Sequence, residues 1–183
     1  MTAGDAVGWN QRRSSATDTT SFRRRIGPTT LPTNATTSGW RSWLSHCRWV
    51  RGVDFSPVQA ERARRLFPRA DIRCEDMTEL QLPEAPLDAV VALYSIIHVP
   101  VAEQPTLFGS IHRWLRPGGM LLAIVGATEG TGSEDDWLGA PMYWSHADRD
   151  TYLRWLGDIG FELRWHRFVP EDDGGHTLLL LRK

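Results

Sequence analysis

Lysine is almost absent from this chain of 183 residues, since Lys183 is the only one and all other side-chain cations are arginines. Cysteine is also scarce. Cys47 and Cys74 lack the spacing of a disulfide framework or a metal site, so we expect no bound metal and a reducing compartment. No apolar run reaches the roughly 20 residues of a membrane-spanning helix, and the arginine pairs near the start precede no apolar segment. These absences predict a cytoplasmic protein without a membrane partner.

Charge is unevenly distributed along the chain. The net charge is −1, but residues 1–49 carry seven arginines and two acids, whereas residues 50–183 carry 14 cations and 20 acids. A nucleic-acid-binding domain would present a basic groove, so the acidic second part favours a small-molecule partner over nucleic acid. With 41% hydrophobic and 23% charged residues, the chain has enough apolar side chains for a folded core.

Residues 1–48 show no pattern of regular secondary structure. They are rich in Thr, Ser and Arg, have neither strand alternation nor a helical stripe, and contain the breaks Gly27-Pro28 and Leu31-Pro32. We therefore expect an irregular or disordered N-terminal segment, followed by a folded domain over residues 49–183. Two alternatives stay open. The segment is an organellar transit peptide, because it is rich in Arg and Ser and poor in acids, or it derives from an out-of-frame or rearranged 5′ region.

From residue 49 onward, strand and helix patterns alternate. Residues 49–54 predict a short strand, and residues 56–66 predict a helix, since they begin with a serine N-cap and a proline at the first helical position. Residues 71–74 predict a second strand. The apolar run 87–97 predicts a strand buried on both faces, with a short helix before it.

The second half of the domain continues this alternation. Residues 107–115 have helical spacing, residues 120–125 predict another buried strand, and a further helix should begin at residues 145–148. The last two strands, residues 161–168 and 176–181, flank a glycine-containing turn and predict an antiparallel hairpin. The order predicts an α/β fold with a mostly parallel sheet and helices on both faces. In such sheets, ligands bind beyond the carboxyl ends of the strands.

Two acids stand at the ends of successive predicted strands. Asp54 follows the first strand, where a carboxylate can accept both hydroxyls of a ribose. Asp76 follows the next strand, where it can accept a hydrogen bond from an adenine amine. Either acid alone would be read as a solvated loop residue, but the pair with a capped helix between them is a more specific pattern.

Five segments in this order resemble the consecutive motifs of class I S-adenosylmethionine-dependent methyltransferases: VRGVDFSPVQAERARRLFP, IRCEDMTEL, LDAVVALYSIIHVP, LRPGGMLLAIVGA and LGDIGFEL. The similarity covers about residues 50–183. It implies a Rossmann-like fold, S-adenosyl-L-methionine as cofactor and methyl transfer to a small-molecule acceptor. It also implies a cofactor site made of the residues that follow three strands: Asp54 and Phe55, Asp76 and Met77, and Tyr94 and Ser95.

The acceptor side of the site is expected directly after the apolar run 87–97 and beyond the strand over residues 120–125. His98 follows the long apolar run and is a candidate general base, or else a loop histidine that is hydrogen-bonded to backbone. The glycine- and acid-rich stretch 126–136 is expected to be a flexible loop. The aromatic residues that follow it form either a substrate lid or a plug over the core. In a lid, the acceptor would meet Tyr143, Trp144 and His146.

One motif of the family is missing. An apolar strand that ends in an acid, followed by a glycine-rich turn of the form (D/E)-x-G-x-G-x-G, should lie about 20 residues before Asp54. That region contains one glycine, Gly39, and no apolar strand. We therefore expect an N-terminally truncated or altered family member whose sheet lacks its first strand. The alternative function is that of a non-catalytic remnant or interaction module. A nicotinamide-dependent oxidoreductase is disfavoured, because it needs a GxGxxG turn after its first strand and the sequence has none there.

Overall fold

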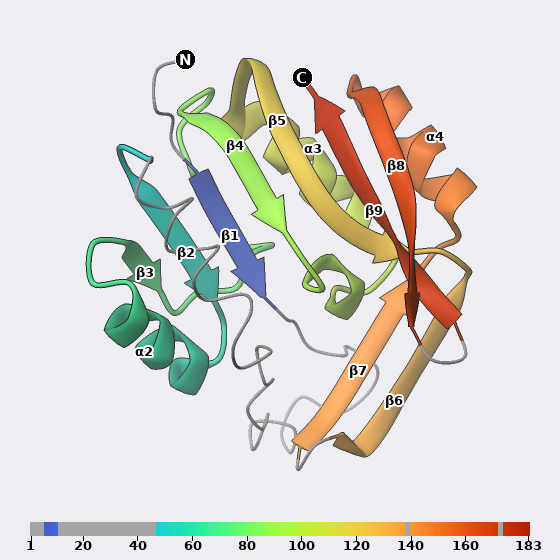
Figure 1. Cartoon of the computed structure of the whole chain (residues 1–183), viewed down its shortest axis with the longest axis horizontal. Coiled ribbons are helices and arrows are strands. Elements are labelled where there is room, and N and C mark those ends of the chain that lie inside the picture. Colours follow the sequence, from blue (N-terminus) through green and yellow to red (C-terminus); the bar gives the residue numbers. More distant parts are fainter. Residues whose placement is uncertain (1–5, 11–46, 138–139, 172–173) are drawn as a thin grey trace.

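The computed structural model describes residues 6–10, 47–137, 140–171 and 174–183, with residues 6–10 described by their backbone alone. Seven strands form one twisted sheet in the order β3-β2-β1-β4-β5-β9-β8 (Figure 1). The first five are parallel, and β9 and β8 complete the sheet as an antiparallel pair, so the predicted fold class is confirmed. The strands are β1 (Ala6–Asn10), β2 (Val50–Asp54), β3 (Asp71–Arg73), β4 (Leu87–Ala92), β5 (Leu115–Gly126), β8 (Glu162–Glu171) and β9 (Gly174–Arg182).

The expectation that the first strand is missing was wrong. Strand β1 occupies the centre of the sheet and pairs in parallel with both neighbours, so that Gly8 lies opposite Gly52 of β2 and Val91 of β4. It therefore supplies hydrogen-bond partners to two strands that would otherwise carry unpaired buried backbone groups. Strand β1 lies within the segment predicted to be irregular. Residues 11–46 of that segment lie outside the described residues, so the predicted domain boundary at residue 48 stays a prediction.

We had expected the apolar run 87–97 to be a single strand, and this expectation was wrong. Strand β4 ends at Ala92, Tyr94 has a φ of 52°, and a short 3-10 helix, η1 (Ile96–His98), follows. A tyrosine in the left-handed region costs on the order of 1–3 kcal/mol, so its surroundings must hold it there. The apolar residues of η1 are buried as a turn against the core. The short helix expected before β4 is also absent from the described residues, where a turn over residues 77–79 takes its place.

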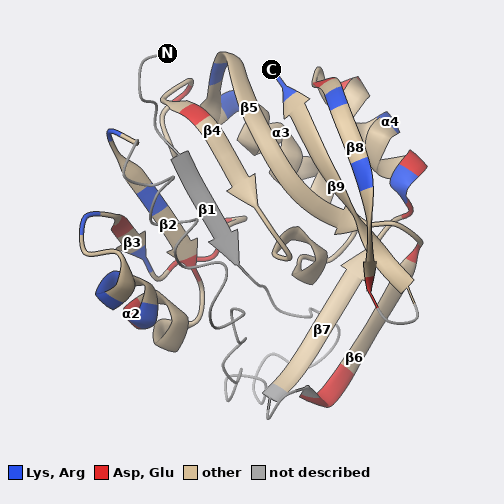
Figure 2. Ribbon diagram, viewed as in Figure 1, with Lys and Arg blue, Asp and Glu red and all other residues tan. Residues whose placement is uncertain are grey.

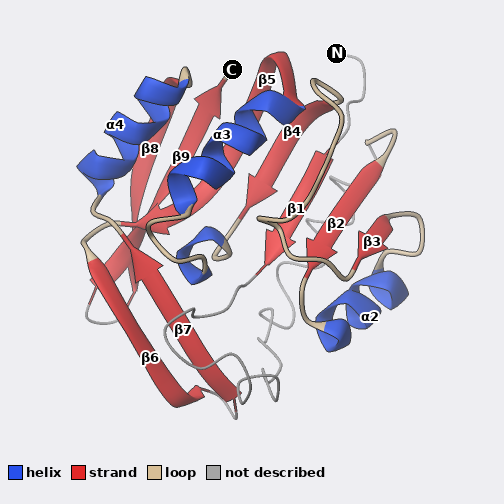
Figure 3. Ribbon diagram, turned by 180° about the vertical axis from the view of Figure 1, so that it is seen from behind, coloured by secondary structure: helices blue, strands red, loops and turns tan. Residues whose placement is uncertain are grey.

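Among the described residues, three α-helices accompany the sheet: α2 (Pro57–Leu66), α3 (Gln104–Trp114) and α4 (Arg149–Ile159). Helices α3 and α4 lie side by side over one face of the sheet (Figure 3), and α2 packs against β2 and β3. The Ser56 hydroxyl caps α2 by accepting from the backbone amide of Gln59, as the sequence predicts. Asp148 is the N-cap of α4, where its carboxylate accepts from the Thr151 amide at 2.8 Å, and Gly160 is the C-cap in the left-handed region.

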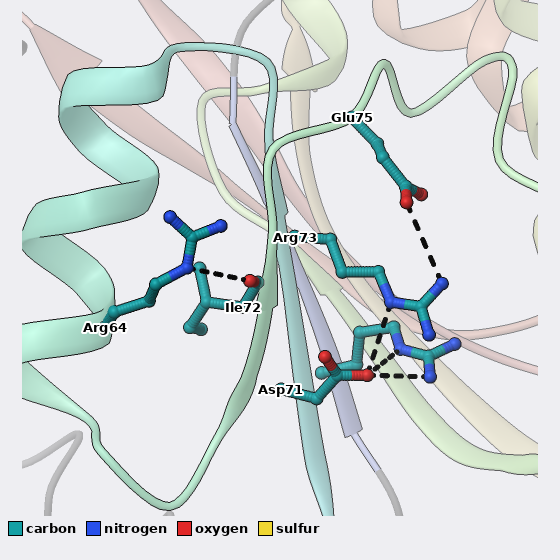
Figure 4. Close-up of polar contacts among 6 residues, drawn as sticks. Arg64, Asp71, Ile72, Arg73 and Glu75 are labelled. Carbon is teal, nitrogen blue, oxygen red and sulfur yellow. Dashed lines mark hydrogen bonds and ion pairs between the residues drawn. The ribbon is translucent and has the colours of Figure 1, made fainter.

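The short edge strand β3 is held by arginines from two sides (Figure 4). Arg64 of α2 donates to the backbone oxygen of Ile72 at 3.1 Å, which ties the helix to the strand. Asp71 accepts hydrogen bonds from Arg51 of β2 at 2.8 Å and from Arg73 at 3.3 Å. These contacts fix β2, which ends at the predicted cofactor acid Asp54, beside β3, which precedes the second predicted acid, Asp76.

A separate two-stranded sheet lies at the carboxyl edge of the parallel strands. It consists of β6 (Gly130–Trp137) and β7 (Ala140–His146), which pair in an antiparallel manner outside the main sheet (Figure 1). The stretch 126–136, expected to be a flexible loop, is therefore largely strand, because its residues pair across to the aromatic segment. None of the helices in the described part of the chain is long and apolar enough to cross a membrane.

Candidate functional site

The predicted site residues line the carboxyl edge of the sheet. Asp54 ends β2, Asp76 lies shortly after β3, and Tyr94 lies shortly after β4. Because these strands are parallel, their carboxyl ends meet at one edge, where ligands of such sheets bind (Figure 1). At the same edge, His176 near the start of β9 pairs with Gly126 at the end of β5.

The Asp54 carboxylate is held in place by the turn that follows it. Its Oδ1 accepts a hydrogen bond of 2.8 Å from the backbone amide of Ser56, which is itself the N-cap of α2. The neighbouring backbone oxygen of Phe55 accepts from the Cys74 thiol at 3.6 Å, which links the segments after β2 and β3. The acid therefore has a fixed direction at the end of its strand, as a ribose-binding carboxylate requires.

The second acid is fixed in a similar way. Oδ1 of Asp76 accepts from the backbone amide of Thr78 at 2.9 Å and from its hydroxyl at 3.0 Å. The adjacent Met77 side chain is buried and packs in the hydrophobic core with Leu80. The structure thus places Asp76 at the predicted position, while the Met77 side chain also serves the core.

Tyr94 and Ser95 follow β4 and differ sharply in environment. Tyr94 is 37% exposed and donates its hydroxyl to Oε1 of Glu171 on β8. Partial burial and this carboxylate raise the pKa of Tyr94 to about 12, so the phenol stays protonated. Ser95 is completely buried, and its hydroxyl has no hydrogen-bond partner in the described part of the chain. An orphaned buried hydroxyl costs free energy, which a hydrogen-bond partner would offset.

His98 lies in η1 and is 7% exposed. Its Nδ1 lies 2.6 Å from the backbone oxygen of Tyr143, to which it donates, and so connects η1 to β7. Burial is the main cause that lowers the pKa of His98, and the nearby His176 lowers it further. The ring is therefore neutral near pH 7. Its predicted role as a general base stays a prediction.

The aromatic segment forms strand β7 beside η1. Tyr143 and Trp144 are half-buried, and His146 donates from Nδ1 to the backbone oxygen of Thr128 at 2.6 Å. The His146 ring is packed closely against glycine: a Cβ added at Gly126 would lie 2.5 Å from its Nδ1. The structure thus brings this segment next to His98, while Asp54 and Asp76 lie along the same edge on the strands beyond β1.

Three functional candidates did not emerge from the sequence. Glu171 and His176 flank the hairpin turn between β8 and β9, and His176 donates from Nδ1 to Oε2 of Glu171 at 3.1 Å. The His176 ring meets the edge of Tyr94 at a centroid distance of 5.3 Å and lies 6.1 Å from the His146 ring. The third candidate is Gln104, which is fully buried and connects η1, β7 and α4. The antiparallel hairpin expected from the sequence was the only available signal for the first two.

The site has some of the groups that would hold a nucleoside cofactor, but it lacks the glycine turn. The fixed carboxylate of Asp54 and the orphaned hydroxyl of Ser95 are suited to polar groups of a ligand at this edge. The glycine turn expected after the central strand is missing, because the sequence has no glycine from residue 9 to residue 26. Within the described residues, no group of three or more His, Cys, Asp or Glu side chains is arranged to hold a metal ion.

Comparison with known proteins identifies relatives of this chain. The family described as a methyltransferase domain matches residues 36–119. A probable S-adenosylmethionine-dependent methyltransferase of Mycolicibacterium smegmatis is 37% identical over 75 residues, which are 41% of this chain and 28% of that protein. Phosphoethanolamine N-methyltransferase 1 of Triticum aestivum is 29% identical over 141 residues, which are 73% of this chain and 27% of that protein. The chain therefore spans little more than a quarter of these relatives.

The fold is shared with solved structures. The 1,6-didemethyltoxoflavin-N1-methyltransferase of Burkholderia thailandensis, solved with 1,6-didemethyltoxoflavin and S-adenosylhomocysteine bound, superimposes with a TM-score of 0.64. The match covers 99% of this chain and 71% of that structure, at 17% sequence identity. At this identity the likeness establishes the fold alone.

Proposed function

We propose that this chain, which is similar to S-adenosylmethionine-dependent methyltransferases of class I, transfers a methyl group to a small-molecule acceptor, with cofactor affinity reduced by the missing glycine turn. The observation that carries the proposal is the Asp54 carboxylate, which the Ser56 amide fixes at the carboxyl end of β2. A ribose diol has two hydroxyl donors, and a carboxylate with a fixed direction can accept from both.

The other cofactor contacts follow from the order of the strands. We assign the adenine to the turn after β3, with Asp76 and the backbone of Met77, beside Phe55 after β2. The methionine end would then lie after β4, next to Tyr94 and the orphaned hydroxyl of Ser95. When bound, this cofactor supplies a methyl group on a positively charged sulfur, which is already a reactive donor.

The remaining residues serve the acceptor. Tyr143, Trp144 and His146 of β7 stand beside η1, where an acceptor would lie between the aromatic strand and the end of β4. His98 holds β7 through the backbone of Tyr143 and keeps a neutral imidazole at this place. Their contribution is to orient the acceptor and exclude water, which accounts for much of the acceleration in such transfers.

A small molecule is supported as the acceptor by charge and by the relatives. Residues 50–183 carry six more acids than cations, which disfavours a polyanion. The wheat relative is named for phosphoethanolamine and the Burkholderia structure for 1,6-didemethyltoxoflavin.

Calorimetric titration of the full chain with S-adenosylhomocysteine tests the ribose assignment. Asp54→Ala should weaken binding on the order of tenfold or more, because charge-assisted hydrogen bonds contribute about 1.5–3 kcal/mol. Asp54→Asn keeps an oxygen for the Ser56 amide and separates loss of the turn from loss of the carboxylate. Asp158→Ala, at an exposed site on α4, is the matched control. If Asp54→Ala binds as tightly as the unchanged chain, the assignment is wrong.

The missing glycine turn favours a second function, that of a non-catalytic member of the fold which binds a partner. Glycine allows a backbone to approach a ligand closely, and the sequence supplies none from residue 9 to residue 26. If S-adenosylhomocysteine gives no heat of binding in calorimetry with a protein that unfolds cooperatively, the result would favour this second function. The same result on a protein without a cooperative transition would instead indicate a damaged chain.

A further inference from the structure

We propose that Glu171 and His176 form a proton-accepting dyad for a cationic amine acceptor, an inference that rests on the proposed methyl transfer. The two residues face each other across the hairpin turn and stand at the carboxyl edge of the sheet, next to the end of β4. Nothing in the family motifs of the sequence points to them, because they come together only through the antiparallel pairing of β8 and β9.

The hydrogen bonds around Glu171 fix both partners. Oε1 accepts the Tyr94 hydroxyl, and Oε2 accepts Nδ1–H of His176 at 3.1 Å. A carboxylate can only accept, so the proton of the neutral imidazole lies on Nδ1, and Nε2 keeps its lone pair. A histidine oriented in this way by a carboxylate is the arrangement that general bases use in many enzymes.

Four groups from different elements face the His176 ring. Glu171 lies on β8, His146 on β7, Tyr94 after β4 and His98 in η1. Burial is the main cause that lowers the pKa of His176, His146 lowers it further, and Glu171 acts in the opposite direction. The neutral imidazole needed for a base is thus the prevailing form near pH 7.

His176 suits the role of base better than His98 does. His98 is 7% exposed and its Nδ1 holds the backbone of β7, so its ring has a structural task. The side chain of His176 is 18% exposed, and its carboxylate partner Glu171 is 41% exposed. An acceptor can therefore approach the dyad from solvent without separating two strands.

The surrounding charge favours a cation. Figure 2 shows acidic residues on β6 and at the end of β8, and no cation on the described residues of β6 and β7. The sequence has no arginine or lysine from residue 117 to residue 148, while Glu129, Glu134, Asp135, Asp136 and Asp148 fall within that range. Arg149, the first cation after this range, is paired with Asp150 at 2.8 Å. A cationic amine is attracted to this edge, and an anionic acceptor is repelled.

The proposed step balances as follows. Nε2 of His176 takes one proton from the ammonium group of the acceptor, which leaves a nitrogen lone pair. That nitrogen forms a bond to the methyl carbon as the sulfur–carbon bond breaks, so that the sulfur becomes a neutral thioether. The imidazolium, stabilised by the Glu171 carboxylate, then releases its proton to water.

The dyad itself is tested without any ligand by NMR titration of the histidine rings in the full chain. Glu171→Gln is isosteric and should move the midpoint of His176 to lower pH, because it removes the carboxylate that favours the imidazolium. Glu61→Gln on α2 is the matched control and should leave the midpoint where it is. An unchanged His176 midpoint in Glu171→Gln would overturn the dyad.

The acceptor class is tested with three probes of one shape: benzylamine, benzyl alcohol and benzoate. Binding is measured by ligand-observed NMR in the presence of S-adenosylhomocysteine. Benzylamine should bind on the order of tenfold more tightly than benzoate, and Glu171→Gln should reduce that ratio, whereas Glu61→Gln should not. Equal binding of the amine and the carboxylate would overturn the amine assignment.

Catalysis by the dyad is read from methylation of benzylamine. His176→Gln should lower kcat while S-adenosylhomocysteine affinity, measured by calorimetry, stays as in the unchanged chain. Unchanged kcat in His176→Gln would refute the role of base. Failure of the unchanged chain to bind S-adenosylhomocysteine would instead refute the proposed function, and the ring titration distinguishes these two failures.

Discussion

The hydroxyl of Tyr152 donates a hydrogen bond of 2.6 Å to the side-chain oxygen of Gln104, and both side chains are completely buried. The amide nitrogen of Gln104 donates in turn to the backbone oxygens of Val99 and Ser145, each at 2.7 Å, and to that of Ile96 in η1 at 3.2 Å. One side chain at the start of α3 therefore joins α4 to η1 and to β7, the elements that flank the acceptor side of the site. A fully satisfied buried network of this kind fixes one arrangement of the elements around it.

Replacement of Gln104 by methionine should destabilise the protein strongly. Methionine has a similar length but cannot hydrogen-bond to Tyr152, Val99 or Ser145, so several buried polar groups lose their partner. We expect the free energy of unfolding to fall by about 2–5 kcal/mol, measured by urea denaturation. Gln81→Met is the control, because Gln81 is exposed. Equal midpoints for the two variants would contradict the structural role of the network.

Gly126 should not tolerate a side chain. A Cβ at this position would lie 2.5 Å from Nδ1 of His146 and 2.6 Å from the backbone oxygen of Ala147, and the backbone atom cannot rotate away. We expect Gly126→Ala to cost about 1–3 kcal/mol and to shift the His146 ring resonances in NMR spectra.

The matched control for this substitution is Gly157→Ala. Gly157 lies within α4, and a Cβ there would meet no atom within 4 Å. Alanine should therefore stabilise the protein by roughly 0.5–1 kcal/mol, since glycine within a helix loses more conformational freedom on folding. If both alanine variants have the same effect, close packing at Gly126 is not what decides the outcome.

Local patterns were enough to place Asp54 and Asp76 at the carboxyl edge of the predicted sheet. Asp54 was found because a strand and a capped helix meet around it, and the Ser56 cap is formed by residues three positions apart. Asp76 was found by the same reasoning one strand later. In both cases the interactions that position the side chain lie within a few residues in sequence, where residue type and spacing decide the conformation.

Long-range pairing explains what the sequence did not reveal. The central strand β1 has five residues with a glycine in the middle, and its neighbours begin about 40 and about 80 residues later, so its position depends on tertiary pairing. Glu171 contacts Tyr94 across 77 residues for the same reason. A register drawn for the expected hairpin would have placed Glu171 and His176 on either side of its turn, which was the one signal within reach.

Substitution of Ser95 should have opposite effects on the stability of the protein and on its affinity for the ligand. Its hydroxyl is buried without a partner in the described residues, so Ser95→Ala removes a desolvated polar group and leaves almost the same volume. We expect the free energy of unfolding to stay the same or to rise by about 1 kcal/mol in the absence of ligand. The same substitution should weaken S-adenosylhomocysteine in calorimetry, if the hydroxyl meets the methionine end.

The comparison for Ser95 is Ser110→Ala. Ser110 lies on α3 and accepts from Arg113 near the surface, away from the carboxyl edge. This variant should leave S-adenosylhomocysteine affinity as it is. A clear loss of stability in Ser95→Ala would show that its hydroxyl has a partner in solution.

The buried histidines predict a loss of stability on mild acidification. Burial is the main cause that lowers the pKa of His98 below its ordinary value of about 6.5, so the unfolded chain takes up the proton before the folded protein does. The free energy of unfolding should therefore be level above about pH 6.5 and fall as the pH drops below it. The pKa of His176 is lowered in the same direction, which adds to the slope.

His98→Gln keeps a donor for the Tyr143 backbone but cannot titrate, so its slope should be shallower. Urea denaturation between about pH 8 and about pH 5 measures this slope above the range in which most carboxylates titrate. Gln81→Met serves as the control with an unchanged slope, and coincident slopes for His98→Gln and the unchanged chain would show that His98 is solvated in the folded protein.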